Sequence, residues 1–362
     1  MSEKPRVLEN WTIVDDGRNV DASLGTLSGE AATQITPSSK HDADLHAQAF
    51  SEVPSRQSFE SPTYYGHPVL KQPVWIWSIP TYFYVGGLAG VGAALGAAAQ
   101  LIAPDAMRSL IIRSRWLGTV GGAVSSALLI HDLGRPERFL NMLRVFRVRS
   151  PMSMGSWILV GFSTASGAAA VLPFGPSLFR PLAGIFGVFA GVFGLGLSGY
   201  TAVLISQTAV PVWHRSYRIT PVLFLASGSA AAASFFDLLP LNANEARAVE
   251  TFGLAGKALE LGAALTLEAN ASKVERVGRP LNEGFSGFLW RTAKMLTFAS
   301  IVTSLLPGKS RGKRIATGVL GSAASACFRF GIFYAGKASA RDPRATFEQQ
   351  RALKAEAAVA DM

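Results

Sequence analysis

The feature that most constrains this chain is an alternation of long apolar segments with short charged ones. Residues 72–104 contain no Asp, Glu, Lys or Arg, and a helix needs about 20 such residues to cross the hydrocarbon core of a bilayer. Comparable apolar segments follow along the chain, at 116–133, 150–179, 181–213, 219–236, 248–267, 287–306 and 315–336. We therefore predict an all-α integral membrane protein, a bundle of about eight transmembrane helices.

The composition supports this class and excludes others. Hydrophobic residues make up 49% of the chain and charged residues only 16%, with a mean hydropathy of +0.27. The basic residues behind the net charge of +10 stand between apolar segments, which is typical of membrane-flanking charge rather than of nucleic-acid binding. Cys327 is the single cysteine, and no two histidines are spaced to face each other across a haem, so we expect no haem or metal in this chain.

The domain organisation follows from the same pattern. Residues 1–60 are polar and lack helical or strand periodicity, so we predict a disordered N-terminal tail. We predict an eight-helix transmembrane domain over 61–336 and a polar C-terminal tail over 337–362. Within that domain, the first four-helix bundle covers about 72–213 and the second about 219–336. An excess of Lys and Arg on the N-terminal side favours a multi-pass protein of the cell membrane with both termini in the cytoplasm.

The stretch 131–159, "HDLGRPERFLNMLRVFRVRSPMSMGSWIL", concentrates arginine between two apolar segments. Gly134 and Pro136 predict the end of a helix, because glycine tolerates the left-handed cap and proline cannot continue the hydrogen-bond ladder. After this end, Arg138, Asn141 and Arg144 recur at helical spacing. This spacing predicts a short helix on the membrane surface or against a partner. The predicted docking surface consists of Arg138, Asn141, Arg144, Arg147 and Arg149. It would bind either lipid headgroups or a soluble subunit.

Polar and aromatic residues of the first four predicted helices gather at one membrane face. They are Trp75, Tyr82, His131, Asp132, Arg135, Trp157, Tyr200 and Gln207. Such a cluster suits a quinone headgroup, whose carbonyl oxygens need hydrogen-bond donors and whose ring favours aromatic walls. His131 and Asp132 would relay the protons that quinone reduction requires. The alternative interpretation is an interfacial aromatic belt next to a structural turn.

The segment 248–267 and its C-terminal flank carry charges at membrane depth, namely Lys257, Glu260 and Glu268. Ionisable groups at such depth usually pair with one another or line a wet pathway. Two interpretations stay open, a structural pair of Lys257 with Glu260 and a proton pathway. Lys294 and Arg329, from the last two predicted helices, are possible partners for these acids.

Several motifs resemble one known family. "HDLGRPERFLNMLR" followed by "SPMSMGSWIL" resembles the signature of the NrfD-like family, the membrane subunits of polysulfide reductase and related molybdenum oxidoreductases. "YYGHPVLKQPVWIWSIPTYFYVGGLAG" and "TAVLISQTAVPVW" are similar to family patterns too. The resemblance covers roughly residues 61–336.

This resemblance implies a quinone-reactive membrane anchor with no redox metal of its own. Such a subunit exchanges electrons between menaquinone or ubiquinone in the lipid bilayer and a ferredoxin-like iron–sulfur subunit, which is coupled to a molybdopterin-dependent catalytic subunit. The family's quinone pocket lies in the first four-helix bundle. The positions that match the family pattern are Tyr82, Asp132, Arg135, Arg138, Asn141, Arg144 and Tyr200.

Two other functions remain compatible with the sequence. In a transmembrane ion or solute transporter, the charges of 248–267 and Arg329 would line the substrate path, although the paired broken helices common in transporters are not evident. A purely structural anchor would only hold a soluble enzyme at the membrane. The substrate of the complex, and the direction of electron flow, would be decided in another chain.

Overall fold

The computed structural model describes residues 20–21, 26–27, 69–135, 137–308 and 310–360. The chain divides into two units, Met1–Tyr64 and Tyr65–Met362. In the first unit, strand β1 (Val20–Asp21) pairs antiparallel with β2 (Thr26–Leu27). The rest of the predicted N-terminal tail lies outside the described residues, so its disorder stays a prediction.

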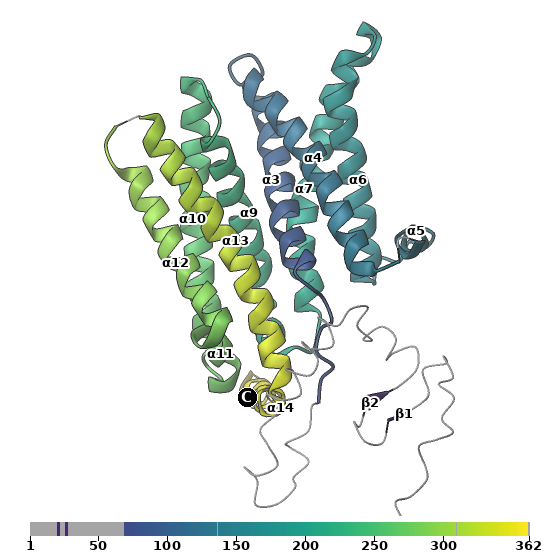
Figure 1. Ribbon diagram of the computed structural model, residues 1–362, viewed down its shortest axis with the longest axis vertical. Coiled ribbons are helices and arrows are strands. Elements are labelled where there is room, and N and C mark those ends of the chain that lie inside the picture. Colours follow the sequence, from purple (N-terminus) through teal and green to yellow (C-terminus); the bar gives the residue numbers. More distant parts are fainter. Residues whose placement is uncertain (1–19, 22–25, 28–68, 136, 309, 361–362) are drawn as a thin grey trace, which may run out of the picture. The chain divides into compact units, whose positions relative to one another are not determined.

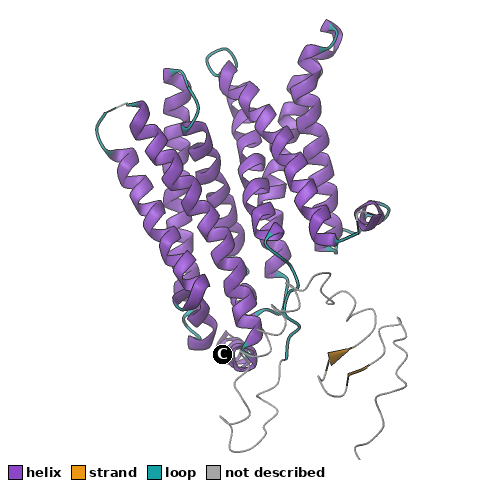
Figure 2. Ribbon diagram, in the orientation of Figure 1, coloured by secondary structure: helices purple, strands orange, loops and turns teal. Residues whose placement is uncertain are grey.

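The described part of the second unit consists of helices and the loops that join them (Figures 1 and 2). Its long helices are α3 (Ser78–Ile102), α4 (Arg108–Leu133), α6 (Pro151–Val171), α7 (Arg180–Ser206), α9 (Thr220–Asp237), α10 (Ala243–Ala271), α12 (Gly284–Leu305) and α13 (Arg311–Arg341). Shorter or terminal helices are α5 (Glu137–Leu143), η3 (Leu172–Phe174), η4 (Ser177–Phe179), α8 (Pro211–Arg215), α11 (Glu275–Asn282) and α14 (Pro343–Ala360).

The prediction of an all-α membrane protein is confirmed, and each long helix falls on one of the apolar segments. Four of the described helices are long and apolar enough to cross a membrane, by length and composition. These candidate spans are Ser78–Ile102, Pro151–Phe174, Ser177–Ser206 and Arg311–Arg341. The other long helices carry more charge or less hydropathy, so a total of eight crossings stays a prediction.

The long helices run alternately up and down (Figure 1). One group consists of α3, α4, α6 and α7, and the other of α9, α10, α12 and α13. Contacts of α3 with α9 and α13, and of α7 with α9, join the two groups. The start of α3, the end of α4, α5, the start of α6 and the end of α7 all lie at one end of the helices, here named the α5 end.

Small residues let α3 and α7 approach closely. A Cβ atom added to Gly90 would lie 2.3 Å from the carbonyl oxygen of Gly194, and one added to Gly194 would lie 2.3 Å from that of Gly90. Any side chain here would force the helices apart. Close backbone packing of this kind replaces the hydrophobic effect as the force between helices in lipid.

Glu245 links the two groups at the end opposite to α5. Its side chain is fully buried, and its Oε1 accepts a 2.7 Å hydrogen bond from the backbone N–H of Leu110 in the first turn of α4. Its Oε2 accepts from the backbone N–H of Asn242, 3.0 Å away, in the capping box of α10. One carboxylate therefore stabilises the starts of two helices, where backbone donors are unpaired and the helix dipole favours negative charge.

The helix that contains the last apolar segment extends beyond it. That segment ends at residue 336, whereas α13 continues to Arg341 and α14 (Pro343–Ala360) follows it; the bounds of the transmembrane domain and of the polar tail stay predictions. The reason is that Lys337 finds partners inside the bundle. Its Nζ donates to the carbonyl oxygen of Trp75 at 3.0 Å and lies 5.7 Å from the ring centre of Phe333, so the charge does not end the helix.

Candidate functional site

Asp132 ties the end of α4 to the start of α3. The helix ends directly after it, where Gly134 has a φ of 68°, a conformation that favours glycine. The Asp132 Oδ1 accepts from Ser78 Oγ at 3.1 Å and from the backbone N–H of Ile76 at 3.3 Å. Since the N-cap of α3, Trp77, makes no side-chain cap of its own, Asp132 supplies an acceptor to donors that would otherwise be unpaired.

His131 and Arg135 lie beside this junction and are exposed. The ring centroid of His131 is 5.8 Å from that of Trp77, with the planes tilted by 47°. The junction therefore combines a carboxylate held by hydrogen bonds with an imidazole that is open to solvent.

Tyr82 and Tyr200 form a pair slightly deeper in the first group. Tyr82 is 2% exposed, Tyr200 is half-buried, and the two lie near enough to interact electrostatically. Neither hydroxyl is hydrogen-bonded to another described residue. The ring of Tyr200 lies directly against the backbone of α6, because a Cβ atom on Gly155 would be 1.9 Å from the Tyr200 Cζ. The glycine thus provides the space that holds Tyr200 on the side of α6.

Trp75 and Trp157, the two tryptophans of the predicted cluster, pack against different aromatic side chains. Trp75 stacks on Trp213 with centroids 6.1 Å apart, and the Trp213 Nε1 donates to the carbonyl oxygen of Ile332 at 2.8 Å. Trp157 is 39% exposed and packs edge-on against Phe146 at 6.0 Å. Trp75 therefore packs towards α8 and α13, and Trp157 towards the loop after α5.

An apolar groove runs along α6 and α7 next to Trp157. Its volume is about 540 Å³, and its wall is aromatic and aliphatic. The aromatic lining comes from Phe146, Trp157, Phe186, Phe189 and Phe193. Gln207, the remaining residue predicted to bind the quinone, is exposed at the C-cap of α7. It lies at the α5 end but does not line this groove.

Lys337 is a residue of this region that the sequence reasoning missed. Besides its hydrogen bond to the Trp75 carbonyl, its charge attracts that of Asp132. The C-terminal part of α13 therefore brings a cation to the junction of α3 and α4. The helix-compatible run "FGIFYAGKASAR", which has no Pro and no turn signal after Gly336, could have revealed that α13 extends this far.

A second polar cluster lies inside the other group of helices. Glu260 is fully buried and Lys257 is 1% exposed. The Glu260 Oε1 accepts from Ser325 Oγ at 2.9 Å, and Oε2 accepts from Thr297 Oγ1 at 3.3 Å. Among the described residues no ion pair joins Lys257 to Glu260; hydroxyl groups hold the carboxylate instead.

Arg329 extends this cluster to the first group of helices. Its side chain is 1% exposed, its Nη2 donates to the carbonyl oxygen of Phe224 at 2.6 Å, and its guanidinium lies 3.9 Å from the Phe224 ring centre. A Cβ atom on Gly87 of α3 would be 2.8 Å from the same nitrogen. Attraction between Arg329 and Glu260 therefore connects α10 with the surface of α3.

Glu268 has a different environment. Lys294 Nζ lies 2.5 Å from its Oε2, and Trp290 Nε1 donates to the same oxygen at 3.1 Å. The carboxylate is about one-fifth exposed. Lys294 is thus the partner of Glu268, as the sequence suggested, and Glu268 lies closer to water than Glu260.

The predicted docking surface is exposed along its whole length. None of the described residues of α5 is buried, and Arg138, Asn141, Arg144, Arg147 and Arg149 are exposed. Ser153, in the first turn of α6, fixes the loop that follows, because its Oγ donates to the Val145 carbonyl at 2.9 Å and accepts from the Arg147 N–H at 3.1 Å. The short helix expected here is confirmed.

The comparison with protein families agrees with these features. The family model described as "Polysulphide reductase, NrfD" matches residues 67–253, just over half of the chain. The chain belongs to the NrfD family. The matched range begins before α3 and ends within α10, so it includes the junction at Asp132, both tyrosines and α5. No curated protein sequence matches the chain significantly. The family resemblance read from the loop motif is confirmed.

Proposed function

We propose that this NrfD protein is the quinone-reactive membrane subunit of a multi-subunit oxidoreductase. The family consists of membrane subunits of quinone-linked oxidoreductases. The observation that carries the proposal is the pair of tyrosine hydroxyls, Tyr82 and Tyr200, without a hydrogen-bond partner among the described residues. Neither hydroxyl is engaged by another described residue, so both are available to donate to the acceptor atoms of a ligand.

The pair lies at a depth suited to a quinone headgroup. Tyr82 stands one turn inside the start of α3 and Tyr200 less than two turns from the end of α7. At about 1.5 Å per residue, both lie roughly 6–9 Å from the helix ends. That depth would be close to the membrane surface. There the headgroup of a lipid-soluble quinone could accept hydrogen bonds from the tyrosines and receive protons from the aqueous side.

The junction at Asp132 supplies the proton route in this proposal. Reduction of a quinone consumes two electrons and two protons. His131 would exchange protons with water, and Asp132 would pass them towards the tyrosines while remaining anchored by Ser78. Lys337 would offset part of the cost of burying the charged form of Asp132, because a nearby cation favours the carboxylate.

The groove along α6 and α7 suits the apolar part of the molecule. Menaquinone and ubiquinone both carry a polyprenyl tail, and the wall that contains Trp157 is almost entirely apolar. Trp157 would then bind the tail rather than the headgroup. Arg135 and Gln207, both exposed at the α5 end, would border the entrance.

Electrons must enter or leave through a partner, because the chain has one cysteine and a cluster needs several. A ferredoxin-like iron–sulfur subunit, itself coupled to a molybdopterin-dependent subunit, fits this role. The exposed arginines of α5 and the following loop would dock it, since charged rims steer and orient redox partners. Binding of anionic lipid headgroups is the alternative use of the same arginines.

The buried cluster of α10 is proposed as a second proton route. Glu260 and Lys257 lie away from water, and Glu260 is bound by hydroxyls that can themselves pass protons. Arg329 links the cluster to α3. Glu268, which is partly exposed, would open this route to solvent.

Asp132→Asn tests the proposal in the assembled complex. Asparagine keeps the acceptor oxygen for Ser78 and Ile76 but cannot carry a proton at neutral pH. We expect assembly to be retained and quinol-linked turnover to be lost. Ser78→Ala is the matched control, since it removes one hydrogen bond and no titratable group. Normal turnover in Asp132→Asn would remove this residue from the proton route.

A further inference from the structure

The apolar groove along α6 and α7 continues towards the tyrosine pair. Phe186, Phe193 and Tyr200 follow one another at seven-residue intervals on α7, which is close to two helical turns, so they lie on one face of the helix. Phe186 and Phe193 line the groove, and Tyr200 stands roughly 10 Å further along the helix than Phe193. The Tyr200 ring lies against Gly155, next to Met154 at the α5 end of the groove. A ligand held by the Tyr200 hydroxyl could therefore extend an apolar chain along the groove.

The groove is elongated and opens sideways. Along α6 it runs from Met154 to Ala165, roughly 16 Å at about 1.5 Å per residue, and its volume of about 540 Å³ is typical of a ligand site. Phe189 is 52% exposed on one wall and Trp157 39% on the other, on helices that are long and apolar enough to span a membrane. In a bilayer this opening would face the lipid, so a quinone would enter without crossing water.

Phe146 and Trp157 form a fixed aromatic wall at the α5 end of the groove. Their rings meet edge-on, with centroids 6.0 Å apart. Ser153 holds Phe146 in place, because its Oγ bonds to both chain neighbours of Phe146, the Val145 carbonyl and the Arg147 N–H. A fixed aromatic surface gives a methyl-branched chain many close contacts, which together supply attraction.

Gly161 lets the ring of Phe193 lie against α6. A Cβ atom added to Gly161 would be 2.8 Å from the Phe193 Cε1 and 3.0 Å from its Cζ, and both residues line the groove. Any side chain at position 161 would turn the ring out of its place or force α6 and α7 apart. The missing side chain therefore keeps the groove open beside the ring.

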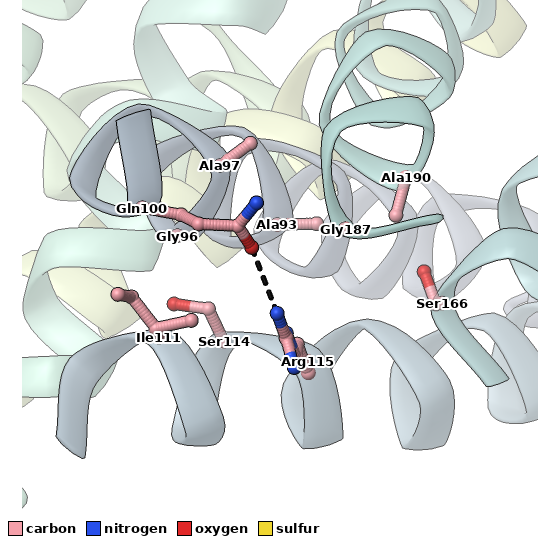
Figure 3. Close-up of a pocket in the computed structure, with 10 residues that line it drawn as sticks. All are labelled: Ala93, Gly96, Ala97, Gln100, Ile111, Ser114, Arg115, Ser166, Gly187 and Ala190. Carbon is pink, nitrogen blue, oxygen red and sulfur yellow. Dashed lines mark hydrogen bonds between the residues drawn. The ribbon is translucent and has the colours of Figure 1, made fainter. Parts of the chain in front are cut away.

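A second hollow in the same group of helices does not fit an apolar chain. It lies between α3, α4, α6 and α7 beside Arg115, whose Nη2 donates to the Gln100 Oε1 at 2.8 Å (Figure 3). Its volume is about 10 Å³, no more than one water molecule needs. The groove, with its larger volume, has the room that this hollow lacks.

We propose that the groove selects quinones with a polyprenyl tail and that Gly161 is the residue that determines this specificity. The inference rests on the proposed function and deepens it: the tyrosines bind the headgroup, and the groove prefers a molecule with a long methyl-branched tail to the same headgroup without one. Lipid is as apolar as the groove, so the tail gains packing against the aromatic wall rather than a hydrophobic free energy. The tail should therefore strengthen binding by about three- to tenfold, not by many orders of magnitude.

The test compares two quinones that share a headgroup and differ in the tail. The full chain in lipid nanodiscs is titrated with a menaquinone that carries several isoprene units and with menadione, its tailless form, and quenching of tryptophan emission reports binding. A ubiquinone and its tailless benzoquinone form the second pair. Affinities are compared between protein variants for each quinone, so that partitioning into lipid cancels.

Thr164→Phe is the variant that fills the groove. Thr164 lines it and is exposed, so the new ring takes up groove volume without disturbing the core. Thr266→Phe is the matched control, because Thr266 is an exposed threonine on α10, in the other group of helices. Gly161→Ala tests the specificity residue itself, since the displaced Phe193 ring should narrow the groove.

Thr164→Phe and Gly161→Ala should weaken the tailed quinone about three- to tenfold and leave the tailless one unchanged, while Thr266→Phe should change neither. Equal affinity for the tailed quinone in Thr164→Phe and the unmodified protein would overturn the inference and leave the groove to lipid acyl chains. An equal loss for both quinones would overturn it too, because the substitution would then act on the headgroup. Absence of binding of any quinone to the unmodified protein would refute the proposed function, and the inference with it.

Discussion

Gly155→Ala tests whether the position of the Tyr200 ring against α6 matters for quinone binding. The new Cβ would lie 1.9 Å from the Tyr200 Cζ and 2.2 Å from its hydroxyl oxygen, so the ring has to move. Overpacking of this kind costs about 1–3 kcal/mol, and the better helix propensity of alanine offsets about 1 kcal/mol. The net loss of stability should therefore be about 0–2 kcal/mol, small enough for the protein to fold.

The effect on ligand binding follows from the displaced hydroxyl. Losing one neutral hydrogen bond costs about 0.5–1.5 kcal/mol, which corresponds to roughly 2- to 10-fold weaker binding. The assay is titration with a short-chain quinone analogue, followed by quenching of tryptophan emission, together with an unfolding midpoint for each protein.

Gly167→Ala is the control for this experiment. It lies on the same helix, α6, but an added Cβ meets nothing within 4 Å. We expect unchanged quinone affinity and unchanged or slightly higher stability. Unchanged affinity in Gly155→Ala, or an equal loss in Gly167→Ala, would refute the reasoning that Tyr200 is held in place for the ligand.

Further predictions concern the charges that the helices bury. Glu260→Gln replaces one carboxylate oxygen by an amide nitrogen, which can donate to Ser325 or Thr297 if that hydroxyl turns to accept. We therefore expect a stable protein whose quinone-linked proton uptake is slowed; unchanged uptake, measured with a pH-sensitive dye in vesicles, would exclude Glu260 from the route. Glu245→Ala leaves the backbone donor of Leu110 unpaired and should lower the free energy of unfolding by about 1–3 kcal/mol; a neutral effect in denaturant unfolding would contradict the capping role. Lys294→Met leaves the mostly buried carboxylate of Glu268 with Trp290 as its remaining partner, so the free energy of unfolding should fall by about 1–3 kcal/mol, with unchanged turnover if the pair is structural.

Much of the fold could be predicted because bilayer physics acts on local sequence. Charge-free segments became long helices, and the loop with Gly134 ended α4 and led into the short helix α5. The apolar segment ends at residue 336, but the helix continues to Arg341. Lys337 has partners in Trp75 and Phe333, which come from packing and are invisible in the local pattern.

The site could be predicted only in part for the same reason. Alternation of helices brings Asp132 and the start of α3 to one end, and the two tyrosines to a similar depth. It does not specify which way a side chain turns. Trp75 turns towards Trp213 and Trp157 towards the groove, and these directions depend on neighbours far away in the sequence. The capping box of Asn242 and Glu245 is local in sequence, whereas the hydrogen bond from Leu110 to Glu245 joins residues far apart in the chain.

The most direct test of the central claim is the binding of a quinone analogue to the purified chain and to a variant that combines Tyr82→Phe with Tyr200→Phe. Phenylalanine keeps the packing of both rings and removes only the two free hydroxyls. The account predicts saturable quenching of tryptophan emission at one site in the unmodified protein and an affinity at least several-fold lower in the double variant. Absence of saturable binding, or equal affinity in both proteins, would contradict it.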